Sequence, residues 1–129
     1  MAEDLRGSLA AVELADDLPF IAKRVFVIYG VPSSEVRGAH AHWRCEQFLI
    51  CVAGSVRCIL DDGAERREFT LDNPARGLHI PAMTWGTQYH YTPDAVLLVF
   101  ASRPYEEADY IRNYETFIDA VAAKERIQA

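Results

Sequence analysis

The sequence predicts an all-β domain, built as a sandwich or barrel of short strands and followed by one short helix. Short runs of β-branched and aromatic residues recur at regular intervals, and turn residues separate them. A helical spacing of apolar residues occurs only near the C-terminus. The 129 residues, half of them apolar, are enough for one core, so we expect a single domain over 1–129.

Seven segments carry the strand pattern, namely 23–29, 46–52, 55–60, 66–71, 78–80, 87–91 and 95–101. The run Asp61-Asp62-Gly63-Ala64 predicts a hairpin turn, because glycine accepts the positive φ that such turns need. Pro81 and the run Thr92-Pro93-Asp94 separate the later strands. The helix is expected where an apolar stripe runs through Tyr114, Phe117, Ile118 and Val121.

Charge and composition exclude several classes of partner. A net charge of −6 disfavours nonspecific binding to nucleic acid or to an anionic membrane. The chain has no apolar run of about 18 residues, and charged residues near its start give no signal-peptide pattern. Cys45, Cys51 and Cys58 form no CxxC pair, so we expect reduced, buried thiols in a cytoplasmic protein.

The segment 46–52 is apolar on both faces. Phe48, Ile50 and Val52 alternate with Leu49 and Cys51, and such a strand is usually covered on both sides. A chain of this size has little material for an outer layer, so a second copy of the chain is one expected cover, which predicts a homodimer. The C-terminal helix is the alternative cover.

Two of the four histidines lie two residues apart, at His40 and His42. On an extended strand, residues i and i+2 point to the same face, so both imidazoles are expected in one cavity. Two groups that titrate near neutral pH in one pocket suit either metal binding or proton transfer. The pattern alone leaves both possibilities open.

The metal interpretation adds Glu46 to the two histidines. This HxH followed by Glu resembles the first motif of the cupin superfamily, whose metal-binding members carry a further histidine in a second motif. Gly86 stands about where that histidine is expected. Three ligands can still hold a metal, but the missing fourth favours metal-free proton chemistry, so no metal or other cofactor is expected.

A wider resemblance favours the proton-transfer interpretation. The chain resembles the sugar-nucleotide 3,4-ketoisomerases, the group that acts on dTDP-4-keto-6-deoxyglucose, from about Lys23 to Phe117. It departs from them at Gly86, where many relatives are expected to carry histidine. Five blocks carry the resemblance: Arg37-Gly38-x-His40-Ala41-His42-x-x-x-Glu46-Gln47, Leu60-Asp61-Asp62-Gly63, Leu71-Asp72-x-Pro74-x-x-Gly77-Leu78, Pro81-x-x-x-Trp85, and Ala101-Ser102-x-x-Tyr105-x-Glu107-x-Asp109-Tyr110-Ile111-Arg112-x-Tyr114.

The resemblance implies a cupin-type jelly-roll, also called a double-stranded β-helix, and a dTDP-linked nucleotide-sugar substrate. It also implies that a ketone moves from C4 to C3 of the hexose through an enediol. His40 is then the expected base at C3, and His42, with Tyr29, is the expected partner that relays or returns a proton. Arg37 is the candidate donor to the developing enediolate oxygen.

Three more residues complete the expected substrate-binding set with Arg37. Glu46 is expected to orient a histidine through a hydrogen bond. Trp85 is a candidate to stack on the base or the sugar, and Arg57 is a candidate to meet the diphosphate. The alternative for Glu46 is a metal ligand, for Trp85 and Tyr29 it is core packing, and for Arg57 it is an exposed surface position. For the segment 109–112 the alternative is simple anchoring.

Other functions remain open from the sequence. A metal-dependent cupin enzyme such as a dioxygenase would hold its ion through the two histidines and Glu46. A ligand-binding cupin module without catalysis is a second alternative, although no DNA-binding segment accompanies it. A sugar-nucleotide epimerase, which also removes a proton next to a ketone, is a third.

Overall fold

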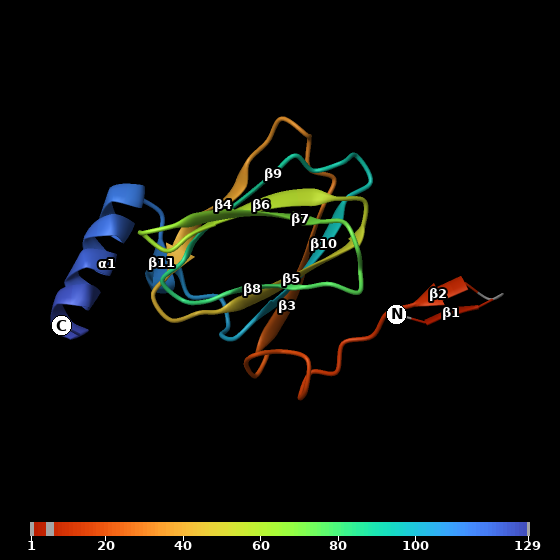
Figure 1. The fold of residues 1–129 in the computed structure, drawn as a ribbon, viewed down its shortest axis with the longest axis horizontal. Coiled ribbons are helices and arrows are strands. Elements are labelled where there is room, and N and C mark those ends of the chain that lie inside the picture. Colours follow the sequence, from red (N-terminus) through yellow and green to blue (C-terminus); the bar gives the residue numbers. More distant parts are fainter. Residues whose placement is uncertain (1, 5–6, 129) are drawn as a thin grey trace.

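Two antiparallel sheets form the body of the molecule (Figure 1). The structure is a computed structural model that describes residues 2–4 and 7–128. One sheet has the strand order β3 (Arg24–Tyr29), β10 (Val96–Ala101), β5 (Gln47–Ala53) and β8 (Leu78–Ile80). The other has the order β11 (Tyr110–Ile111), β4 (Arg37–His42), β9 (Trp85–Tyr89), β6 (Val56–Asp61) and β7 (Arg66–Leu71). Neighbours in both sheets are mostly distant in sequence, as in the expected jelly-roll, so the predicted all-β fold is confirmed.

The remaining elements lie at the ends of the chain. The strands β1 (Ala2–Asp4) and β2 (Gly7–Leu9) pair with each other and lie away from the two main sheets (Figure 1). A single turn of 3-10 helix, η1 (Glu107–Asp109), precedes β11, and the helix α1 (Tyr114–Gln128) follows it. No helix in the described ranges is long and apolar enough to cross a membrane.

The main core lies between the two sheets. The inward face of β5 contributes Leu49 and Cys51, which are almost fully buried. A second cluster lies on the outer side of the five-stranded sheet, where Phe117 of α1 packs on Ala41 and Ile111. The end of β4 at Ala41 is therefore covered on one face by the helix, while the other face of the strand lines the space between the sheets.

The seven expected strands are all present, with small shifts at their ends. The largest shift is at β9, which ends at Tyr89 instead of position 91. His90 has a positive φ of 54°, which interrupts the extended backbone and turns Tyr91 into the core. The strands β1, β2 and β11 were not foreseen, because each has only two or three residues and a strand signal needs a longer run.

The three cysteines are free and buried, as expected. Burial raises the pKa of the Cys58 thiol to about 12, so this side chain stays a neutral, unreactive thiol at neutral pH.

The outer face of β5 is not covered by the C-terminal helix, so that alternative is wrong. The helix packs on the opposite sheet, at the end that carries Trp85 and Tyr114. Part of the N-terminal segment lies beside β5 instead, where Val12 lines a shallow hollow with Phe48 and Ile50. Large apolar side chains on this sheet remain exposed, among them Val25, Val27, Tyr29 and Val52.

Asp61 connects the β6–β7 hairpin to the helix. Its buried carboxylate accepts hydrogen bonds from the Tyr114 hydroxyl at 2.5 Å, the Gly63 amide at 2.8 Å and Nε of Arg66 at 3.0 Å. Burial alone raises the pKa of this carboxyl, but the hydrogen bonds outweigh it and hold the pKa below its usual value. Gly63 has a positive φ of 95°, as the predicted turn requires.

We predict that Asp61→Asn destabilises the fold by about 1–3 kcal/mol at neutral pH, because a buried charged acceptor with three donors is lost. The lowered pKa means that the wild-type advantage is fully present above the unfolded carboxyl's pKa of 3.8 and is lost as the pH falls through the lower folded pKa. Urea unfolding at pH 7 and at pH 3 measures both effects. Glu115→Gln, in the exposed first turn of α1, is the control, and equal stability of Asp61→Asn and wild type would contradict the assignment.

Candidate active site

A cavity of about 290 Å³ lies between the two sheets at the end that holds β4 and β11. Both sheets contribute to its wall, so the site depends on their packing rather than on one loop. Apolar side chains from β3 and β10 form one side together with Gln47 of β5, and residues of the other sheet face them. The lining residues are Phe26, Ile28, Arg37, Gly38, His40, Gln47, Gln88, Val99, Tyr110 and Arg112.

The two histidines share a face of β4, as their spacing predicts. The ring centroids of His40 and His42 are 4.9 Å apart in an edge-to-face arrangement. Tyr110 of β11 is the pairing partner of His42 on β4. The centroid of its ring lies 5.0 Å from that of His40 and 4.4 Å from that of His42. His40 lines the cavity, while His42 is buried behind it and only 6% exposed.

A bulge in β4 brings Arg37 to the same cavity as His40. Arg37 pairs with Gln88, but His40 pairs with Gly86, so three steps on β4 match two on β9. Gly38 has a positive φ of 67° at this point, as in bulges that begin with glycine. A Cβ on Gly38 would come within 2.8 Å of the Gln88 amide group, which would then have to move out of its place in the cavity wall. Without the extra residue, the pleat would place Arg37 and His40 on opposite faces.

The environment holds both imidazoles in their neutral form. Burial, with smaller effects from His42 and Arg112, lowers the pKa of His40 to about 4. Burial also lowers the pKa of His42, and the neighbouring Asp109 carboxylate opposes that effect. A neutral imidazole can accept a proton at pH 7, which is the property that a general base needs.

Three arginines surround the histidines although the chain as a whole is acidic. Arg37 and Arg112 line the cavity, and the guanidinium of Arg112 lies 4.2 Å above the Tyr110 ring. Glu107 holds Arg112 through two contacts of 3.1 Å. Arg24 lies near Tyr105 and His42, and its buried Nε has no hydrogen-bond partner among the described residues. This concentration of positive charge suits an anionic ligand.

Tyr29 and Arg57 are not brought to this cavity. On β3 the inward residues are Phe26 and Ile28, so Tyr29 points outward and is 72% exposed. On β6, Arg57 lies on the outer face of the sheet, with a distant ion pair to Glu68 at 3.8 Å. The alternation of side chains along each strand explains both placements. A role in the site stays a prediction for both residues, and their positions within a single chain do not support it.

Glu46 and Trp85 also lie away from the cavity lining. Glu46 does contact a histidine, but the partner is His79 of β8, at 2.8 Å between Oε1 and Nε2, rather than His40 or His42. Trp85 packs on the rings of Tyr114 and Phe117 under the helix, at 5.3 Å and 5.8 Å between centroids. The core-packing alternative therefore describes Trp85 better than stacking on a substrate.

The donor set of a metal-binding cupin is not assembled on the two histidines. Glu46 is turned to His79, and Gly86, directly opposite His40, offers no ligand atom. Donor atoms of His42, Cys45 and Asp109 lie within 4.8 Å of one another, but both Asp109 oxygens already accept backbone amides. We assign no metal to these residues.

Several residues of the site were not singled out from the sequence. Gln47 and Gln88 line the cavity, and Asp109, Tyr110 and Arg112 approach the histidines from the far end of the chain. The last three belong to the Asp109–Arg112 run, whose agreement with a known family was the available signal. Gln47 also closes the first block of that resemblance, whereas Gln88 gave no signal beyond its place in an expected strand.

Comparisons with known proteins agree on one family. The family model described as "FdtA: WxcM-like, C-terminal" matches residues 1–122. The TDP-4-oxo-6-deoxy-alpha-D-glucose-3,4-oxoisomerase of Aneurinibacillus thermoaerophilus is 45% identical over 119 residues, which cover 92% of this chain and 86% of the relative.

Solved structures give the same result. A doubly substituted QdtA 3,4-ketoisomerase from Thermoanaerobacterium thermosaccharolyticum, in complex with TDP, is 40% identical with a TM-score of 0.91, and the match covers 95% of this chain and 89% of that one. Another variant of that enzyme, in complex with TDP-4-keto-6-deoxyglucose, matches with 40% identity and a TM-score of 0.88 over 92% of this chain and 86% of that one. The NovW 4-keto-6-deoxy sugar epimerase of Streptomyces spheroides is 19% identical over 84% of this chain and 63% of that one, with a TM-score of 0.70, so it shows a shared fold alone.

We predict that the imidazole of His40 titrates near pH 4 instead of 6.5 in the free protein, because burial and nearby positive charge disfavour its protonated form. Arg112→Gln removes one of these charges and is expected to raise the pKa of His40. Arg103→Gln, which removes a charge paired with Glu106, is the control. NMR titration of the imidazole nitrogens measures the pKa of His40 in all three proteins. A His40 pKa near 6.5 in the wild type would contradict the expected effect of burial.

Proposed function

The chain belongs to the FdtA family of WxcM-like proteins and is a sugar-nucleotide 3,4-ketoisomerase, and we propose that His40 and His42 carry out its proton transfers. The reaction moves the ketone of a TDP-linked 4-keto-6-deoxyhexose from C4 to C3. One observation carries the proposal. The neutral imidazoles of His40 and His42 share one face of β4, and His40 lines a cavity together with the guanidinium of Arg37.

The chemistry needs a base, a proton donor and stabilisation of one oxygen. The C4 carbonyl acidifies the C3 hydrogen, and His40 takes this proton to leave an enediolate with its charge on the C4 oxygen. That oxygen is protonated to give the enediol. A proton is then added to C4 and the C3 hydroxyl loses its own, which leaves the ketone at C3. The substrate and product are isomers, so protons are exchanged without a net gain or loss.

The lowered pKa of His40 fits the role of the base when the charge of the substrate is counted. In the free protein this imidazole is neutral throughout the physiological pH range. The diphosphate brings negative charge toward the site, and a nearby negative charge raises the pKa of a histidine. The basicity of His40 therefore increases when the substrate is bound, toward the range where a base transfers protons well.

Arg37 is the proposed donor to the developing oxyanion, because the bulge at Gly38 aims it into the cavity with His40. The diphosphate needs further positive charge. Arg112 and Arg24 are better placed than Arg57 to supply it, since both lie near the histidines and the Nε of Arg24 is buried without a partner among the described residues.

The direct test is to incubate the purified protein with TDP-4-keto-6-deoxyglucose and identify the product by NMR. We expect the 3-keto isomer, formed with solvent hydrogen at C4. Deuterium exchange without movement of the ketone would indicate epimerase chemistry instead. Stoichiometric iron, manganese or zinc in the active protein, with loss of turnover on chelation, would overturn the metal-free scheme.

We predict that His40→Asn lowers turnover at least about 10²-fold, the typical contribution of a general base, while binding of TDP changes little. Turnover by NMR and TDP affinity by calorimetry separate the two effects. Nearly normal turnover in this variant would remove His40 as the base.

His42→Asn is the matched variant on the same strand. It is also expected to slow product formation, but with His40 intact it still allows exchange of the C3 hydrogen with deuterium from solvent. Normal product formation in His42→Asn would show that His42 does not return a proton. Normal His42→Asn together with inactive His40→Asn would leave His40 as the base and assign the second step elsewhere.

We also propose that the enzyme works as a homodimer that pairs through the outer face of the four-stranded sheet. Val25, Val27 and Tyr29 form an exposed apolar row on β3, and Val52 adds to it from β5. Exposed apolar patches on one sheet face are typical of subunit interfaces, and a twofold axis lets the same patch serve both copies.

Val27→Glu is expected to lower the molar mass measured by light scattering from that of two chains to that of one chain of 14.5 kDa. The reason is that a charge at the centre of the apolar row is costly to bury. Thr70→Glu, on the exposed edge strand β7 of the other sheet, is the control and is expected to stay dimeric. A wild-type protein of 14.5 kDa at micromolar concentration would contradict the homodimer.

A further inference from the structure

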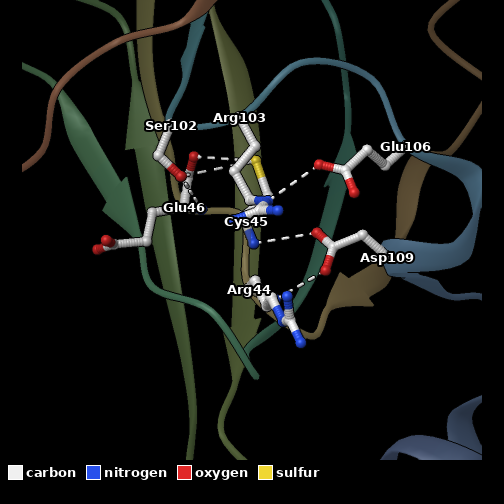
Figure 2. Close-up of polar contacts among 7 residues, drawn as sticks. All are labelled: Arg44, Cys45, Glu46, Ser102, Arg103, Glu106 and Asp109. Atoms are coloured by element: carbon white, nitrogen blue, oxygen red, sulfur yellow. Dashed lines mark hydrogen bonds and ion pairs between the residues drawn. The ribbon is translucent and has the colours of Figure 1, made fainter.

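Asp109 is a buried carboxylate that the reaction scheme above does not use. It lies at the end of η1 and is only 8% exposed. Its Oδ1 accepts the amide of Arg44 at 2.9 Å, and its Oδ2 accepts the amide of Cys45 at 3.0 Å (Figure 2). Its main-chain carbonyl accepts the amide of Trp43 at 2.9 Å. One residue thus binds three consecutive amides, and these follow directly after His42.

The same carboxylate faces the second histidine. A ring nitrogen of His42, a carboxylate oxygen of Asp109 and the Sγ atom of Cys45 all lie within 4.8 Å of one another. The other groups around His42 are neutral or positive. They are Arg24 from β3, His40 from β4, and Tyr110 and Arg112 from β11 and the residue after it. Among the groups named here, Asp109 is the sole negative charge beside this imidazole.

We propose that Asp109 is a positioning residue for His42, which holds the end of β4 in place and lets its imidazole carry a proton during ketone transfer. The inference rests on the proposed role of His42 as the group that returns a proton at C4. The two arginines oppose a positive imidazole, and burial lowers the pKa of His42 further. The Asp109 charge works in the opposite direction and raises that pKa. A purely structural role for Asp109 would explain its three contacts with backbone amides. It would not explain why the carboxylate charge lies beside the imidazole of His42.

The test compares Asp109→Asn with Glu106→Gln. Both remove one negative charge, but Glu106 is exposed and paired with Arg103 at 3.1 Å (Figure 2). NMR titration of the His42 ring is expected to show a lower pKa in Asp109→Asn and no change in Glu106→Gln. The fall in turnover of Asp109→Asn is expected to be greatest at alkaline pH, by about tenfold for each unit by which the pKa falls, with KM within about twofold.

An unchanged His42 titration in folded Asp109→Asn would overturn the proposal, whatever the rate. If Asp109→Asn does not fold, the wild type provides the decisive measurement. The NMR chemical shift of the Asp109 carboxyl carbon, followed against pH, must then show an inflection at the pKa of His42. This inflection must be absent in His42→Asn. No such inflection would overturn the proposal. Failure of the proposed function is separate, because it would appear as absence of the 3-keto product from wild-type protein.

Discussion

The site depends on the pleat of a single strand, β4, and on the one place where that pleat is interrupted. Alternation puts His40 and His42 on the cavity face and Ala41 on the helix face, so one short strand serves two packed layers. The bulge at Gly38 then reverses the alternation, and Arg37 joins the histidines. A regular strand cannot place an arginine and a histidine three residues apart on one face.

The electrostatics of the site follow from the same arrangement. A protein with a net charge of −6 gathers Arg24, Arg37 and Arg112 around one buried and one half-buried imidazole. This positive surrounding suits the diphosphate of the proposed substrate, and it adds to the burial that keeps the histidines neutral in the free protein. Binding and basicity are therefore linked, because the charge that holds the substrate is also the charge that the substrate neutralises. Asp109 gives His42 a different environment from His40 although the two rings are neighbours.

Much of this could be predicted from the sequence, and the failures have a common cause. Period-two patterns identified the main strands and the shared face of the histidines, because both depend on residues within one strand. Glu46 and Trp85 were harder, since their faces depend on where β5 and β9 begin and on which layer covers each sheet. Arg112 and Asp109 reach the histidines through tertiary pairing of β11 with β4. A parity argument within one strand cannot describe a contact of that kind.

The pairing between β4 and the end of the chain has a consequence for the order in which the protein assembles. The amides that follow His42 contact a carboxylate 64 and 65 residues later, and Tyr110 closes over the histidines from the same distant segment. Contacts between distant segments form late and slow folding. While the chain is being synthesised, the two histidines therefore remain open to water until the segment 109–112 has been added. The lowered pKa values of the two histidines are then acquired only when β11 pairs with β4.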